Sequence, residues 1–472
     1  MGLLHNPVLF KILAYTCSGY YASMFTLRVA WGFVKNPTRR FWKVQERLTP
    51  PPCLNDPRFG VHSYIKANGL QFHYVQKGDV TKPLMVFVHG FPEFWYSWRY
   101  QLQEFYKDYW VVALDMRGYG DSDKPEGVNN YDIKYLVEDI AQFVKELGET
   151  LPSLTRSYGI KYLVEDIAQF VKELVECDKE AGECDEELGK CDKDLVECDK
   201  ELRYQFVKKL SHYDKEIDGS EKDLGECDKE PGEYDKELVE CDNELGEWDK
   251  EPSESDKELG ECDNEPGAFD KELGRDKFTL VAHDWGGVVA WRFVDTHAHM
   301  LNSYIIMDAP RLQSWMNMAV SNMQQFRKYV FFFQMPFLPE LFISMHDLVS
   351  FKRLFKKTIP ESSVEDEDVE AFKYTFSKPG ALTAPINWYR ANVLEQQIED
   401  IKTKKDPGVP GLFLFGEKDD YLELAYLEEA KDVIKNLQTV VIEGGNHFVQ
   451  QDKPEAVNKV MRDFLNKHFI DM

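Results

Sequence analysis

Short apolar runs alternate with stretches of helical periodicity along most of the chain. Runs at 62–65 and 70–75, joined at Asn68-Gly69, are typical of a β-hairpin. Continuous apolar runs, as expected of strands buried on both faces, follow at 84–88, 111–114, 278–282, 304–307, 412–415 and 439–442. Helical periodicity separates most of them, most clearly at 131–147. This alternation predicts an α/β fold with an open, mostly parallel sheet.

The run at 278–282 ends abruptly in His283-Asp284-Trp285-Gly286-Gly287, and a helical run follows at once. This layout predicts a nucleophile elbow, a sharp strand-to-helix turn that holds one side chain above the sheet. Small residues are needed at Ala282, Gly286 and Gly287 because the backbones nearly touch there. The elbow carries Asp284, and a carboxylate nucleophile forms an ester that water must hydrolyse. The plainer alternative is a strand end followed by a helix-capping aspartate.

Two later strands end in polar loops that complete a catalytic set. Asp419 follows the run at 412–415, and His447 follows the run at 439–442. The order nucleophile, acid, histidine is that of a triad on this kind of sheet. We therefore expect Asp419 to hold the His447 imidazole, with Asp420 as the alternative acid. The alternatives are an aspartate in an ordinary turn and a histidine in a surface loop.

The N-terminal region contains a largely apolar stretch at 8–34, long enough to span a bilayer as a helix. Basic residues follow it directly, whereas none precedes it: Lys35, Arg39, Arg40, Lys43 and Arg47. The positive-inside rule then predicts a single-pass membrane anchor, with the catalytic domain in the cytosol. The alternative is a buried or surface amphipathic helix. A proline-rich linker at 49–52 leads into the globular part.

The net charge of −26 is concentrated in one segment. Residues 149–274 contain 41 acidic and 17 basic residues, while the rest of the chain contains 42 and 40. The segment also holds seven of the nine cysteines, so the remainder has no disulfide framework and no paired metal-ligand spacing. The remainder is a near-neutral globular sequence, and we expect no nucleic-acid partner.

The acidic segment looks like an insertion. The fifteen residues at 133–147 recur at 160–174, and the second copy leads into a seven-residue repeat. Recurrent glycines and several prolines disfavour a coiled coil, so we expect an exposed, frayed or disordered segment. Soft-metal binding by its cysteines is a weaker alternative. Either copy could dock beside the nucleophile strand. The insertion joins that strand at its N-terminal end, away from the active site.

Several motifs together resemble the α/β-hydrolase epoxide hydrolases. They are HGFPEFWYSWRYQL at 89–102, LDMRGYGDSDKP at 114–125, AHDWGG at 282–287, NWYR at 387–390, FGEKDDYLEL at 415–424 and GGNHFVQQDKP at 444–454. The N-terminal apolar stretch and the run at 329–342 resemble the membrane-anchored vertebrate type. One departure is Asp308-Ala309-Pro310-Arg311, where relatives tend to have Pro-His after the strand.

The resemblance implies a function and a set of site residues. Two lid tyrosines would hydrogen-bond the epoxide oxygen: Tyr389 of the NWYR motif and Tyr329, five residues before Gln334. Backbone N–H groups of Phe91 and Trp285 would form the oxyanion hole, with substrate contacts from His89, Pro92 and Trp285. The implied reaction converts an epoxide, expected to be a lipid epoxide, into a vicinal diol with water and without cofactor or metal.

We therefore expect this division of the chain: 1–48 anchor and basic flank, 49–148 hydrolase core, 149–274 insertion, 275–310 core with the elbow, 311–402 helical lid, and 403–472 core. The expected location is the endoplasmic reticulum membrane. Two other functions remain open. A haloalkane or haloacetate dehalogenase shares the aspartate and the elbow tryptophan but needs a halide cradle. An inactive membrane-anchored scaffold would use the acidic repeat to bind basic partners.

Overall fold

The computed structural model describes residues 7–35, 43–149, 277–315, 328–358, 366–393 and 406–468. The chain divides into one unit made of 1–148 and 269–472 and another made of 149–268, and the first is described below. The predicted acidic repeat and the second copy of the duplicated sequence lie outside the described residues. The predicted boundaries of the insertion stay a prediction.

One eight-stranded sheet forms the centre of the first unit, in the order β1-β2-β4-β3-β5-β6-β7-β8. Its strands are β1 (Val61–Ala67), β2 (Leu70–Lys77), β3 (Leu84–Val88), β4 (Trp110–Leu114), β5 (Phe278–His283), β6 (Leu301–Met307), β7 (Gly411–Gly416) and β8 (Leu437–Ile442). From β4 to β8 all neighbours are parallel, whereas β1, β2 and β4 pair antiparallel. The mostly parallel α/β sheet predicted from the apolar runs is confirmed.

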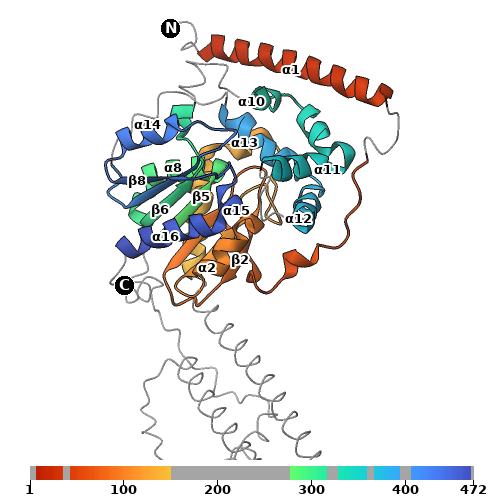
Figure 1. Cartoon of the computed structure of the whole chain (residues 1–472). Helices are drawn as coiled ribbons and strands as arrows, with labels where there is room; N and C mark the ends of the chain where they lie inside the picture. Colours follow the sequence, from red (N-terminus) through yellow and green to blue (C-terminus); the bar gives the residue numbers. More distant parts are fainter. Residues whose placement is uncertain are drawn as a thin grey trace, which may run out of the picture. The chain divides into compact units, whose positions relative to one another are not determined.

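Helices pack around the sheet, and a separate group forms a lid (Figure 1). The core helices are α2 (Arg99–Phe105), α3 (Ile133–Glu149), α8 (Asp284–His297), α14 (Ala425–Val433), α15 (Val449–Asp452) and α16 (Pro454–His468). Short 3-10 helices are η2 (Pro52–Asn55), η3 (Trp95–Trp98), η4 (Val128–Tyr131) and η7 (Ala298–Met300). The lid contains α10 (Lys328–Phe332), α11 (Leu338–Thr358), α12 (Asp366–Phe376) and α13 (Thr383–Val393). Helix α11 is broken at Met345–Leu348, where three residues have positive φ.

The first copy of the duplicated sequence forms α3 and packs into the core. Leu136, Ile140, Phe143 and Leu147 are fully buried. The Phe143 ring lies edge-on to Tyr74 of β2, with the ring centroids 5.4 Å apart. These contacts place the apolar face of α3 against the antiparallel side of the sheet. Helix α3 ends where the acidic segment begins, and β5 resumes the sheet at Phe278.

The apolar N-terminal stretch forms a helix, α1 (Pro7–Lys35). No helix in the described part of the chain is long and apolar enough to cross a membrane. Helix α1 packs on the lid. The buried Ser18 hydroxyl donates to the Phe331 carbonyl of α10 at 2.7 Å, and Phe25 lies 4.8 Å from the ring of Phe332.

Candidate active site

The end of β5 has the geometry predicted for a nucleophile elbow. Asp284 has a φ of +49°, a strained left-handed conformation for a non-glycine residue. The turn is tight: a Cβ at Gly286 would lie 2.4 Å from the His89 carbonyl oxygen, and one at Gly90 would lie 2.4 Å from the Asp284 Cβ. These positions therefore exclude any larger residue. The elbow leaves the Asp284 side chain 17% exposed.

Asp284, Asp419 and His447 meet at the carboxyl ends of β5, β7 and β8. The Nδ1 atom of His447 lies 2.8 Å from Asp419 Oδ2, and its Nε2 atom lies 3.3 Å from Asp284 Oδ2. Asp419 also accepts the backbone N–H groups of Tyr421 and Leu422, at 2.6 and 2.9 Å, through Oδ1. The acid beside the imidazole is therefore Asp419 and not the alternative, Asp420.

The two oxygens of Asp284 have different surroundings. Oδ1 accepts the backbone N–H of Phe91 at 2.7 Å, whereas Oδ2 faces His447. Trp285 follows as a first-turn residue of α8, where backbone N–H groups have no helical partner. The site is therefore arranged so that Oδ1 is held by the Phe91 N–H, whereas Oδ2 lies on the side of His447.

The two carboxylates control the protonation of His447. Burial opposes the charged imidazole, but Asp419 and then Asp284 outweigh it and raise the pKa of His447 well above its ordinary value. The pKa of Asp419 is correspondingly held low: its burial is outweighed by His447 and by backbone N–H donors. Loss of the Asp284 charge would lower the pKa of His447 and make the neutral imidazole available as a base.

Both predicted lid tyrosines face the elbow. The ring centroid of Tyr389 lies 4.9 Å from that of Trp285 and 6.0 Å from that of Tyr329. Burial, followed by the negative charge of Asp284, raises the pKa of Tyr329. Burial, followed by Tyr329 and Asp284, raises the pKa of Tyr389 well above its ordinary value. Both hydroxyls therefore remain protonated at neutral pH, as hydrogen-bond donors must be.

Arg390 fixes α13 against the segment that follows α10. Its guanidinium donates to the carbonyls of Phe333 and Met335, at 3.0 and 2.6 Å, and pairs with Glu340 at 2.8 Å. Because Tyr389 precedes Arg390 and Tyr329 lies on α10, this network holds the two tyrosine-bearing elements together.

The substrate contacts predicted for His89 and Pro92 stay a prediction. His89 is fully buried, and its Nε2 atom accepts the Met116 backbone N–H at 3.1 Å. Its Nδ1 atom lies 2.9 Å from the Gly90 carbonyl. The His89 ring therefore supports the backbone of the Phe91 loop and of the Met116 loop through these two hydrogen bonds. Pro92 is likewise buried, while Phe91 remains partly exposed and lies 5.3 Å from the Tyr389 ring.

Sequence reasoning missed Glu93, which joins three loops of the site. This buried carboxylate accepts the Gly90 N–H at 3.0 Å and pairs with His283 Nδ1 at 2.6 Å. Its other oxygen accepts the side-chain amides of Gln450 and Gln451, both at 2.9 Å. His283 Nε2 in turn lies 2.7 Å from the His447 carbonyl. Glu93 thus links the Phe91 loop, the elbow and the His447 loop. The only local signal was an acidic residue in an otherwise apolar stretch.

We expect Glu93→Gln to remove an acid-sensitive part of the stability. Burial raises the pKa of Glu93, but His283 and the other donors outweigh burial and lower it from 4.5 to about 2. The pair therefore stabilises the fold above about pH 4.5, and this contribution is lost as the pH falls toward 2. Breaking such a buried pair costs about 3–5 kcal/mol at neutral pH. The free energy of unfolding in urea should be measured for both proteins across this pH range. The difference between wild type and variant should become smaller as the pH falls.

Glu104→Gln is the matched control for that measurement. Glu104 pairs with Arg462 at the surface, where both side chains are about a third exposed. Exposed pairs contribute about 0–1 kcal/mol, so this variant should follow the wild type closely. If the free energies of unfolding of Glu93→Gln and wild type changed in parallel with pH, the stabilising role assigned to the Glu93–His283 pair would be contradicted.

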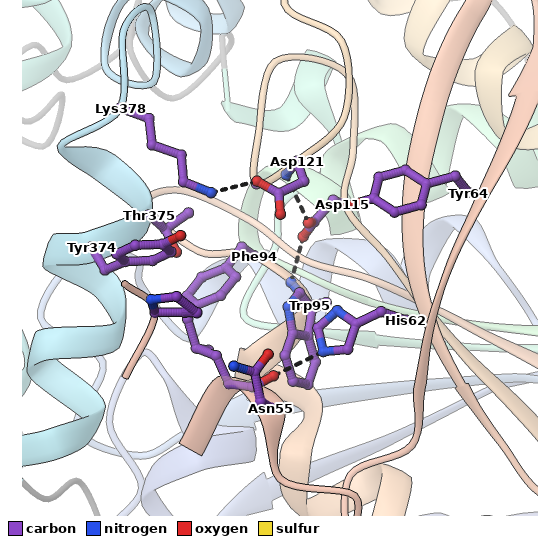
Figure 2. A pocket seen from close by; sticks show the side chains of 13 residues that line it. Asn55, His62, Tyr64, Phe94, Trp95, Asp115, Asp121, Tyr374, Thr375 and Lys378 are labelled. Carbon is purple, nitrogen blue, oxygen red and sulfur yellow. Dashed lines mark hydrogen bonds and ion pairs between the residues drawn. The ribbon is translucent and has the colours of Figure 1, made fainter. Parts of the chain in front are cut away.

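A separate cavity of about 300 Å³ lies between the lid helix α12 and the core (Figure 2). Lys378 pairs with Asp121 across it at 2.5 Å. Behind this pair, Asp115 accepts the Trp95 N–H at 2.8 Å and lies 2.7 Å from His73 Nδ1. None of Asp284, Asp419 and His447 lines this cavity, so it is distinct from the candidate active site.

Comparison with known proteins agrees with this geometry. A model described as "alpha/beta hydrolase fold" matches residues 83–152, and one described as "Alpha/beta hydrolase family" matches residues 251–460. The chain is 29% identical to epoxide hydrolase 4 of Homo sapiens, covering 98% of this chain and 94% of the relative. It is 28% identical to epoxide hydrolase 3 of Xenopus tropicalis, covering 90% and 83%.

Solved structures share the fold. An epoxide hydrolase of Bacillus megaterium, in complex with an inhibitor, aligns with a TM-score of 0.52 at 21% identity, covering 86% of this chain and all of that one. An epoxide hydrolase of Vigna radiata aligns with a TM-score of 0.52 at 20% identity, covering 86% and 98%. The sheet, the elbow and these relatives together show that the chain belongs to the α/β-hydrolase family, and that its similar relatives within that family are epoxide hydrolases.

Proposed function

We propose that the protein hydrolyses lipid epoxides to vicinal diols through a covalent ester on Asp284. The observation that carries the proposal is the placement of a carboxylate nucleophile between a histidine base and two protonated tyrosines. Relatives along nearly the whole chain are named epoxide hydrolases, which supports the reaction class.

In the first step, Asp284 Oδ2 attacks an epoxide carbon and the carbon–oxygen bond of the ring breaks. Oδ1 is held by the Phe91 N–H, so it becomes the carbonyl oxygen of the ester. Tyr329 and Tyr389 donate hydrogen bonds to the departing epoxide oxygen, and one of them transfers its proton to that oxygen and is left as a tyrosinate. General-acid assistance of this kind contributes typically about 10²- to 10⁴-fold.

In the second step, water hydrolyses the ester. Esterification removes the charge of Asp284, which lowers the pKa of His447 and lets its Nε2 take a proton from water. The hydroxide attacks the Asp284 carbonyl carbon, and the oxyanion that forms on Oδ1 is stabilised by the N–H groups of Phe91 and Trp285. Loss of one such donor typically slows reaction by about 10²- to 10³-fold. The bond between the carbonyl carbon and the former Oδ2 then breaks, and the former Oδ2 leaves with the diol after taking the proton held by His447. The new Asp284 carboxyl group loses its remaining proton, which restores the neutral tyrosine.

The membrane association expected from the sequence is proposed for α1. Its outward side chains Leu27, Trp31 and Val34 are 70%, 62% and 69% exposed, although the helix packs on the lid through Ser18. Such a row of apolar side chains suits contact with a lipid surface. It would bring the lid close to lipid epoxides, with the endoplasmic reticulum as the expected membrane.

The test is a single turnover in ¹⁸O-labelled water, with purified full-length enzyme in excess over an epoxy fatty acid. The ester route places the Asp284 oxygen in the diol, so the first diol should be unlabelled and the Asp284 peptide labelled. Diol that carries ¹⁸O in the first turnover would refute the ester. Halide release from a haloalkane without any diol would favour a dehalogenase, and the absence of both would refute the proposed enzyme activity.

A further inference from the structure

A third carboxyl group lies beneath the catalytic residues and is not used in the mechanism above. Asp308 follows β6 with a φ of +42° and is fully buried. Its backbone N–H donates to the Leu414 carbonyl at 3.0 Å, and its Oδ1 accepts the Gly416 N–H at 2.7 Å. These two bonds fasten Asp308 to β7, the strand that leads into the Asp419 loop.

The second oxygen of Asp308, Oδ2, has unusual surroundings. Oδ2 is buried and, in the described part of the chain, has no hydrogen-bond donor. The Asp308 carboxyl lies within hydrogen-bonding contact of the Asp419 carboxyl, and the Asp419 side chain is itself completely buried. A buried acceptor without a donor is strongly disfavoured, and so are two adjacent buried negative charges. A single proton between the two groups removes both problems.

The donors around the pair decide which carboxyl holds this proton. Asp419 accepts three: the backbone N–H groups of Tyr421 and Leu422, and His447 Nδ1. Asp308 accepts one, from Gly416. Hydrogen-bond donors favour the charged form of a carboxyl, so Asp419 stays ionised. Burial, followed by the charge of Asp419, accordingly raises the pKa of Asp308 well above its ordinary value.

We propose that Asp308 is a positioning residue: a protonated carboxylic acid whose O–H donates a hydrogen bond to the Asp419 carboxylate. This bond would be a fourth donor to Asp419 and would orient it toward His447. It would also make Asp419 less basic, which limits how strongly Asp419 holds the imidazolium. Asp308 would thereby help to set the pH at which His447 becomes a base.

The protonation state can be tested without any substrate. At pH 7, the infrared spectrum of the full-length protein minus that of Asp308→Asn should contain the carbonyl stretch of a buried protonated carboxyl. The band should shift in D₂O. A difference spectrum with carboxylate bands only would overturn the proposal. This measurement holds even if the proposed epoxide chemistry fails.

The positioning role rests on the proposed function and is tested by pH profiles of kcat. His447 is faced by Asp419, Asp284 and Asp308, and its ring also lies near His283 and Tyr421. Asp308→Ala removes the donor to Asp419, which becomes more basic. The acidic limb should then move to higher pH by about 0.5–1 unit, so that kcat measured on that limb falls by about 3- to 10-fold.

Asp308→Asn is the matched variant, because its amide can donate to Asp419 and accept from Gly416. It should recover most of the kcat lost in Asp308→Ala and return the acidic limb to near its wild-type position. If Asp308 were ionised, both variants would remove a negative charge near His447 and move the limb to lower pH. That opposite shift, or an equal loss in both variants, would overturn the proposal. Should Asp308→Ala not fold, the Asp308→Asn profile and the infrared spectrum still decide.

Discussion

Replacing His447 with glutamine is expected to halt the enzyme as a covalent ester on Asp284. The nucleophile and the Phe91 N–H that holds its Oδ1 are unchanged, so Asp284 can still attack the epoxide. Glutamine cannot take a proton from water, and the ester therefore accumulates. Steady-state turnover should fall by at least about 10²- to 10⁴-fold. Mass spectrometry should then find the substrate mass added to the Asp284 peptide.

The control for this experiment is the double variant Asp284→Ala/His447→Gln, which should carry no adduct. The wild type should show the adduct only briefly, because loss of the Asp284 charge lowers the pKa of His447 and leaves a neutral imidazole that can take a proton from water. Normal multiple turnover by His447→Gln, or an adduct on another peptide, would exclude the assigned roles of Asp284 and His447.

Replacing both Tyr329 and Tyr389 with phenylalanine is expected to lower kcat/KM by about 10²- to 10⁴-fold. Burial raises the pKa of each hydroxyl, so both stay protonated and can donate to the epoxide oxygen over the neutral range. Phenylalanine preserves the ring contacts among Trp285, Tyr329 and Tyr389 but removes both donors. Ring opening should therefore become slow while the fold is retained, as measured by diol formation and thermal unfolding.

Tyr374→Phe provides the matched control. Tyr374 is another lid tyrosine, but it lines the cavity between α12 and the core (Figure 2), and Asp284 is not among the residues that line this cavity. This variant should form diol at close to the wild-type rate. If the Tyr329/Tyr389 double variant behaves in the same way, the two tyrosines are packing residues and the assignment of the general acid is wrong.

The sequence predicted those features accurately whose causes are local, and it did not predict most of the contacts between distant residues. Strand β3 was predicted at its observed bounds because five consecutive apolar residues have a local cause, burial on both faces. The elbow was predictable for a similar reason, since strand, tight turn and helix lie within ten residues. The hydrogen bonds of the His89 ring were not predictable, because a histidine beside a catalytic loop can face either side of that loop. The backbone N–H of Met116, which donates to the His89 ring, decides which side the ring faces.

The sequence by itself determined the α/β class, the order of the strands along the chain and the prediction that Asp284, Asp419 and His447 come together at the ends of their strands. Periodicity and strand-end position are properties of short segments, and in a parallel sheet the carboxyl ends of strands meet at one edge. Only the tertiary structure decided what surrounds them: Glu93 bonded to Gln450 and Gln451, and Asp308 beside Asp419. It also placed α1 on the lid. Such contacts join residues more than a hundred positions apart, and no local pattern specifies which distant partner will satisfy a buried charge.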